Sequence, residues 1–138
     1  MNIDGVENGI VLDHIQAGKS MEVYRLLQLD KLDCSVAVIQ NAKSTKYGKK
    51  DIIKIDEMIH LDMDILGYID PNITINLVEN NRLIQKSKTA LPEKLTNVIS
   101  CKNPRCITSI EQEIQQIFYL ADEEKQIYRC MYCDVEYS

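Results

Sequence analysis

The 138-residue sequence has no long apolar run, no excess of basic residues and no internal repeat. No stretch approaches the roughly 18 consecutive apolar residues of a membrane-spanning helix, which argues against a membrane protein. Lys and Arg total 16 against 21 Asp and Glu, so the net charge is −5, whereas a general nucleic-acid-binding protein presents a basic face. Residues 1–5 are polar and acidic and lack the apolar segment of a signal peptide, so we expect a reducing, cytoplasmic location.

Cysteine is concentrated at the C-terminal end of the chain. Cys34 falls in an apolar run and is expected to be a buried core thiol. The other four cysteines form two close pairs, Cys101-x4-Cys106 and Cys130-x2-Cys133, with 23 residues between the pairs. Two such pairs supply the four thiolates of a tetrahedral Zn²⁺ site, and a site filled by four thiolates leaves no position for catalysis. The spacing therefore predicts one structural zinc ion.

Other uses of these cysteines stay open on spacing alone. A disulfide is disfavoured in a reducing compartment. Iron–sulfur clusters usually show denser cysteine runs, and a rubredoxin-like iron site would need two C-x2-C pairs where this chain has one. A redox C-x-x-C motif would begin a helix, but Cys130 follows the strand-like residues 126–129. The segment 95–138 is also near the length below which domains need a metal or a crosslink, so metal binding should be coupled to its folding.

The first 90 or so residues alternate between strand and helix patterns. One helix is expected to begin at Ser20 as its N-cap, and a second to run over 62–69 with Asp62 as its cap. A polar loop is expected over 41–50 and a hairpin turn over 79–82, where Asn tolerates positive φ. The expected strands are 10–15, 33–40, 51–56, 72–78 and 83–88. This order is the β-α-β-β-α-β ferredoxin-like pattern with one added strand, and it predicts an antiparallel sheet with two helices on one face.

A linker is expected around Pro92, because a proline favours extended or turn conformations at its neighbours. The predicted chain is therefore α+β with two domains. Residues 1–92 form the ferredoxin-like domain, and residues 93–138 form a small all-β zinc-binding domain.

Polar side chains interrupt the predicted strands. Because the first and third strands are central neighbours in a ferredoxin-like sheet, several lysines would converge near an acidic residue and a histidine. Lysines supply charge for phosphates and a carboxylate can hold sugar hydroxyls, so this set suits a nucleotide. The same residues could equally be the outward side chains of a sheet covered on one face, which alternation alone demands. The residues concerned are Asp13, His14, Lys50, Lys54, Asn76, Lys86 and Lys88.

The sequence resembles the regulatory chain of bacterial and archaeal aspartate carbamoyltransferase over nearly its whole length. The resemblance is carried by G-I-V-L-D-H-I at 9–15, G-K-K-D-I-I-K-I at 48–55, T-I-N at 74–76, K-S-K at 86–88, L-P-E-K-L-T-N-V at 91–98, and the four cysteines at the family spacing. The combination of the first motif, the L-P-E segment and the cysteine spacing is specific.

The resemblance implies a regulatory subunit in pyrimidine biosynthesis that is not itself an enzyme. Its N-terminal domain would pair with a second copy and bind nucleotide effectors, with CTP and often UTP inhibiting and ATP activating. Mg²⁺ could accompany the nucleotides. Its zinc domain would dock on the catalytic chain through Asn103, Arg105 and Asp134.

The resemblance also assigns residues to the nucleotide. Asp13 would hold the ribose or a metal-bridged second nucleotide, and His14 and Lys86 would meet the phosphates. Lys54 would contact ribose and base, and Lys50 would lie near the phosphates or the second nucleotide. Asn76 would line the pocket, and Val6 would offer backbone groups to the base.

The chain departs from the family pattern at Glu7, where a basic residue can stand, at Asn81, where an aromatic can stand, and at Lys88, which replaces an arginine. These changes bear on effector preference and leave the zinc and docking roles intact. Two alternatives come from other classes. One is a zinc-ribbon nucleic-acid or interaction module. The other is an enzyme that uses Asp13 with His14, or His60 with Asp62, although neither pair has a third catalytic partner nearby in sequence.

Overall fold

The computed structural model describes residues 6–137, which form two compact units, one up to Ala90 and one from Leu91 onward. The expectation about the N-terminal segment falls on residues 1–5 and lies outside this range. Within the described range, no helix has both the length and the apolar character needed to cross a membrane.

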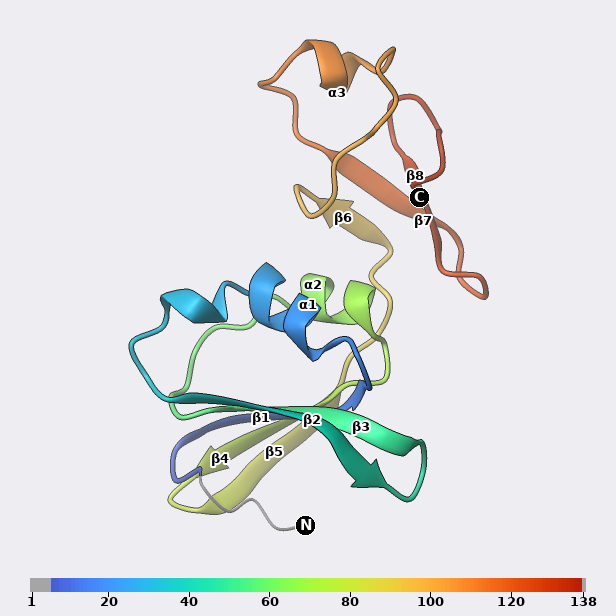
Figure 1. Ribbon diagram of the computed structural model, residues 1–138. Coiled ribbons are helices and arrows are strands. Elements are labelled where there is room, and N and C mark those ends of the chain that lie inside the picture. Colours follow the sequence, from blue (N-terminus) through green and yellow to red (C-terminus); the bar gives the residue numbers. More distant parts are fainter. Residues whose placement is uncertain (1–5, 138) are drawn as a thin grey trace. The chain divides into compact units, whose positions relative to one another are not determined.

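The first unit is a five-stranded antiparallel sheet with helices on one face (Figure 1). The strand order is β2-β3-β1-β4-β5, so the first strand is central and lies beside the third. This arrangement confirms the predicted ferredoxin-like pattern with an added fifth strand. The elements are β1 (Gly9–Gln16), α1 (Ser20–Leu26), the 3-10 helix η1 (Leu29–Lys31), β2 (Val36–Ser44), β3 (Gly48–Ile55), α2 (Met63–Ile69), β4 (Thr74–Glu79) and β5 (Arg82–Lys88).

The main core lies between the sheet and the helices. Alternate residues of β1 face it, with Ile10 and Leu12 buried against side chains of β3 and α2. The predicted cap of α2 is confirmed, because the Asp62 carboxylate accepts the amides of Asp64 and Ile65 at 3.0 and 3.1 Å. At the start of β1 only glycine fits, since a Cβ on Gly9 would lie 2.0 Å from the carbonyl oxygen of Ile55.

The predicted capping role of Ser20 is wrong. Ser20 is the first helical residue of α1 and is buried, and the preceding residue forms no side-chain cap. The buried Asp51 of β3 accepts the amides of Gly18 and Ser20 on one oxygen and that of Asn41 on the other. Burial would raise the pKa of Asp51, but hydrogen bonds from Ser20, Asn41 and Gly18 outweigh it and lower that pKa below its ordinary value. Asp51, on a strand distant in sequence, therefore accepts the backbone amides at the start of α1.

The hairpin of β2 and β3 is longer than predicted. Strand pairing continues to Ser44 opposite Gly48, so most of the expected polar loop over 41–50 is strand. The pairing shifts register between Ile39 and Ala42, where Asn41 has a φ of 59°. An irregular, polar edge hairpin lacks the apolar alternation that identifies a strand in sequence. The turn over 79–82 is confirmed, with φ values of 53° at Asn80 and 62° at Asn81.

The second unit is a three-stranded antiparallel sheet in the order β6-β7-β8. Leu95, Phe118 and Tyr128 are its large buried side chains, and the Tyr128 hydroxyl donates to the carbonyl of Pro92 at 2.6 Å. A four-residue helical turn, α3 (Ile107–Ile110), follows the second cysteine and was not predicted. The strands are β6 (Lys94–Thr96), β7 (Ile117–Asp122) and β8 (Ile127–Cys130).

Candidate ligand site and metal centre

The face of the first sheet opposite the helices, here called the open face, carries a row of polar side chains. Val11 on β1 is paired with Lys54 on β3 and with Asn76 on β4, and Asn76 is paired in turn with Lys86 on β5. Residues directly opposite in an antiparallel pair point to the same face. Since Ile10 and Leu12 face the helices, this row faces the other way. The sheet thus places Lys54 on one side of the central strand β1 and Lys86 on the other side.

Asp13, His14 and Lys50 form a polar cluster at the end of β1. The Asp13 carboxylate is buried and lies 2.9 Å from the ammonium nitrogen of Lys50. The same oxygen accepts the His14 amide at 2.6 Å. The Nδ1 atom of His14 lies 3.0 Å from the hydroxyl of Thr74, a contact that no sequence pattern predicts. The acidic residue, the histidine and one predicted lysine are therefore adjacent.

Val6 and Asn76 form part of the floor of the open face. Val6 is buried with Val11 and Val78 in a small apolar cluster separate from the main core. Asn76 is fully buried and its amide nitrogen lies 3.4 Å from the carbonyl oxygen of Val11. The other side-chain atom of Asn76, Oδ1, is buried and accepts no hydrogen bond from the described residues. The floor thus combines apolar contacts with one buried acceptor.

The cations of the open face act on His14. Partial burial lowers the pKa of His14, Asp13 raises it, and Lys50, Lys86 and Lys46 lower it further, so the net shift is downward. Lys86 is exposed on β5, yet its charge reaches the imidazole. These lysines therefore make the surroundings of His14 more positive, which favours an anion beside it.

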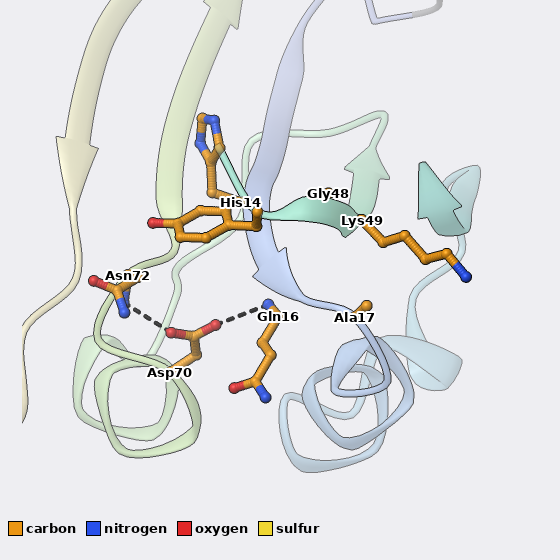
Figure 2. Close-up of a pocket in the computed structure, with 8 residues that line it drawn as sticks. His14, Gln16, Ala17, Gly48, Lys49, Asp70 and Asn72 are labelled. Atoms are coloured by element: carbon orange, nitrogen blue, oxygen red, sulfur yellow. Dashed lines mark hydrogen bonds between the residues drawn. The ribbon is translucent and has the colours of Figure 1, made fainter. Parts of the chain in front are cut away.

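A cleft of about 540 Å³ adjoins this cluster at the end of β1. Figure 2 shows Asp70 between Gln16 and Asn72, whose backbone amides donate to its two carboxylate oxygens at 2.9 Å each. Lys49 extends away from Asp70 and His14 (Figure 2), so the charged groups of the cleft do not converge on one point. The residues lining it are His14, Gln16, Ala17, Tyr47, Gly48, Lys49, Asp70 and Asn72.

The four C-terminal cysteines converge in the second unit. Their sulfur atoms all lie within 4.8 Å of one another, with Sγ–Sγ distances of 3.6 Å for Cys101 and Cys133 and 3.7 Å for Cys106 and Cys130. Four sulfurs about 2.3 Å from a tetrahedral zinc ion would be separated by about 3.8 Å, so the arrangement fits this metal. Cys106 and Cys130 are buried, whereas Cys101 and Cys133 are half-buried. Four thiolate ligands would fill every coordination position of the ion, as in structural zinc sites.

Without a bound cation, the thiols differ widely in acidity. Burial raises the pKa of Cys101 to about 12 and also raises that of Cys130. Burial opposes ionisation of Cys133 too, but hydrogen bonds from Val135, Asn103 and neighbouring thiols outweigh it and lower its pKa to about 7. A cation must therefore displace protons from Cys101 and Cys130, which couples metal uptake to pH.

The three residues expected to meet a catalytic chain lie near this centre. The Asn103 side chain accepts the Arg105 amide at 3.1 Å. Asp134 is exposed, and its carboxylate accepts the hydroxyl of Tyr119 while its backbone carbonyl accepts from Arg129. Asn103 and Asp134 thus have partners within the chain.

The fold and the two sites define a class of protein in which a split β-α-β sheet with a cationic face is followed by a small four-cysteine metal-binding unit. Residues 1–90 match the family described as aspartate carbamoyltransferase regulatory chain, allosteric domain, and residues 93–138 match the metal binding domain of the same chain. The chain therefore belongs to the family of aspartate carbamoyltransferase regulatory chains, and it is regulatory rather than catalytic.

Relatives from two genera support this assignment over the full length. The regulatory chain of Clostridium botulinum is 53% identical over 138 residues, which cover 100% of this chain and 94% of the relative. That of Clostridium tetani is 49% identical over 139 residues, covering 100% and 96%. That of Bifidobacterium longum is 42% identical over 136 residues, covering 99% and 98%.

Proposed function

We propose that the open face binds a nucleotide effector such as CTP, UTP or ATP and that the second unit docks on the catalytic chain of aspartate carbamoyltransferase. The observation that carries the nucleotide site is the clustering of His14, Lys50 and Lys86 on one face of the sheet. Charge-assisted hydrogen bonds to phosphate are the strong ones, so two lysines and a histidine on one face favour a polyphosphate.

Each residue of the open face has a part in this proposal. His14, Lys50 and Lys86 hold the phosphates, and Asp13 holds the ribose or a second nucleotide bridged by Mg²⁺. Lys54 contacts the ribose and base. A ligand donor would satisfy the buried Oδ1 of Asn76, and an unsatisfied buried acceptor costs about 1–3 kcal/mol. Val6 contributes backbone groups to the base.

The second unit serves the docking role in this proposal. The four thiolates of Cys101, Cys106, Cys130 and Cys133 hold one Zn²⁺, which acts by fixing the two cysteine loops. These loops present Asn103, Arg105 and Asp134 to the catalytic chain. The holoenzyme acts in the cytoplasm, with regulatory chains paired through residues 1–92 and the docking domain formed by residues 93–138.

Regulation requires differential binding. A nucleotide changes catalysis only if it binds one quaternary state of the holoenzyme more tightly than the other, and the coupling is reciprocal between the two sites. We infer that the site on the first unit acts on the catalytic chain through the residues that connect the two units.

The nucleotide site is tested with Lys86→Ala in the full chain. Loss of a charge-assisted hydrogen bond to phosphate costs about 1.5–3 kcal/mol, so CTP should bind roughly tenfold to a hundredfold more weakly by calorimetry. Lys31→Ala is the matched control, because Lys31 is an exposed lysine of η1. Unchanged CTP affinity in Lys86→Ala would show that the phosphate assignment is wrong.

The docking role is tested by co-purification with the catalytic chain of the same organism. The two chains should co-elute in the presence of zinc and separate after treatment with a chelator. Arg105→Glu should weaken the complex without loss of zinc, because it reverses a charge beside the ligands and leaves the four sulfurs intact. Co-elution that persists in metal-free protein would contradict a metal-dependent docking surface.

A further inference from the structure

Thr108 lies against the metal centre without being one of its ligands. Its hydroxyl oxygen is 3.1 Å from Sγ of Cys106, and both side chains are buried, with 6% and 2% of their surface exposed. A thiolate bound to a metal has no proton to donate, so in the metal-bound centre Thr108 must be the donor and Cys106 the acceptor. The contact is therefore directional and shielded from competing water.

The local backbone explains why the hydroxyl reaches the sulfur. Thr108 is the second residue of the helical turn α3, which begins directly after Cys106. The neighbouring hydroxyl of Ser109 donates to the carbonyl of Asn103 at 2.7 Å, so the two hydroxyls of this turn have different acceptors. Ser109 secures the first cysteine loop, whereas Thr108 is directed at a ligand atom.

The two halves of the cluster differ in access. A cleft of about 280 Å³ is lined by Cys101 together with Lys102, Asn103 and Val135, among others. Cys106 does not line this cleft, and neither does Cys130. The cluster is therefore accessible at Cys101, whereas the hydrogen-bonded Cys106 is shielded from solution.

We propose that Thr108 is a positioning residue of the metal centre, whose hydroxyl orients Cys106 and withdraws electron density from its thiolate. Groups that hydrogen-bond to metal ligands fix ligand orientation, and their removal commonly costs about 10–100-fold in metal affinity. The hydrogen bond also helps to hold Cys106 on the metal, so the chain should keep its metal longer when an electrophilic thiol reagent attacks the accessible Cys101. This inference goes beyond the docking role, because it concerns retention of the metal in the chain itself.

The test compares Thr108→Val, which keeps the shape and removes the hydroxyl, with Thr108→Ser, which keeps the hydroxyl. In the cobalt-substituted full chain, Thr108→Val should shift the sulfur-to-cobalt charge-transfer band to lower energy, because the thiolate becomes a better donor. Zinc affinity in chelator competition should fall about tenfold, and zinc release by an alkylating reagent should be faster. Thr108→Ser should match the wild type in all three measurements. Thr96→Val, on the exposed strand position of β6, controls for the substitution type.

Two results would overturn the inference. One is a Thr108→Val chain with the wild-type charge-transfer band, affinity and release rate. The other is a Thr108→Ser chain as impaired as Thr108→Val, which would assign the effect to packing of the methyl group. If Thr108→Val does not fold, the cadmium-loaded wild-type chain decides the matter by NMR. The Thr108 hydroxyl proton should exchange slowly and show scalar coupling to cadmium through the sulfur, and its absence would refute the proposal. A wild-type chain that binds no cobalt would instead refute the metal centre itself.

Discussion

His14 is the residue at which the central strand leaves regular geometry. Its φ of 59° is rare for a non-glycine residue, and the pairing of β1 with β3 shifts register between Leu12 and Ile15. At this shift, the Asp13 carboxylate accepts the His14 amide and also pairs with Lys50. Backbone conformations of this kind cost about 1–3 kcal/mol and concentrate at functional sites.

The depressed pKa of His14 predicts a pH-dependent nucleotide affinity. In the free chain the imidazole is neutral at neutral pH, because burial and the charges of Lys50, Lys86 and Lys46 lower its pKa below 6.5 against the opposing effect of Asp13. A bound phosphate favours the protonated form and raises that pKa, so binding takes up a proton. CTP affinity should therefore rise as pH falls through the bound-state pKa and level off below the free-state pKa.

Calorimetry at several pH values, in buffers of different ionisation enthalpy, measures this proton uptake. A shift of about one pKa unit on binding corresponds to about a tenfold gain in affinity across the window. His14→Asn leaves only the titration of the CTP phosphates, so the difference between the two chains isolates the imidazole. Equal pH profiles for the wild type and His14→Asn would show that the imidazole does not meet the phosphates.

At the scale of elements, the sequence patterns predicted correctly those features that depend on residues close together in the chain. The α2 cap was correct because Asp62 and the amides it accepts are neighbours in sequence, and the β4–β5 turn was correct because Asn tolerates positive φ. The start of α1 was missed because Asp51, which satisfies it, lies 31 residues away from Ser20. Thr108 was missed because a threonine two residues after a cysteine carries no distinctive pattern. The first error therefore reflects a contact between distant segments, and the second a local contact that no sequence pattern marks.

The sequence predicted which residue types lie on the open face, but not how they are spaced. Alternation placed Lys54 and Asn76 on strands, and the split β-α-β order placed their strands on either side of β1. The bulge at His14 and its contact with Thr74 depend on register, which a single sequence does not specify to one residue. Sequence alone therefore gave the residue types of the candidate site and left their spacing to the structure.

The three strands of the second unit should depend on the metal for their order. Leu95, Phe118 and Tyr128 are its large buried side chains besides the ligands, which is a small core for a unit of this length. Zinc binding in domains of this kind contributes about 10–16 kcal/mol of apparent folding free energy at neutral pH. Removal of the metal should therefore unfold β6–β8 while β1, β3 and β4 stay folded.

Hydrogen exchange of the zinc-loaded and chelated chain measures this difference element by element. Amides of β7 and β8 should lose protection by several orders of magnitude, and amides of β1 should change little. Readdition of zinc should restore protection, which separates metal loss from damage to the chain. Persistent protection of β7 in a chain shown to be metal-free would contradict the coupling of folding to metal binding.

At the scale of the whole molecule, the connection between the two units is short and held at both ends. On one side, Thr89 donates from its amide to the carbonyl of Ile73 at 3.0 Å and from its hydroxyl to that of Asp70 at 2.8 Å. On the other side, the carbonyl of Pro92 accepts the Tyr128 hydroxyl, and that of Glu93 accepts the Leu120 amide at 2.9 Å. Only Ala90 and Leu91 separate these anchored residues, so we expect a displacement of one anchor to pass along the chain.

Inserting two glycines between Ala90 and Leu91 should uncouple the effector from the catalytic chain. Gly-rich segments behave as flexible coil, so the inserted residues would absorb a displacement instead of transmitting it. CTP affinity and zinc content should stay at wild-type values, because neither site is altered. The coupling free energy between CTP and aspartate, typically about 1–3 kcal/mol, should fall by about half or more in aspartate saturation curves of the reconstituted holoenzyme. The same insertion between Glu123 and Glu124, in the exposed turn after β7, is the control and should leave the CTP effect intact. If the insertion after Ala90 also leaves it intact, the effector acts on the catalytic chain by a route other than this connection.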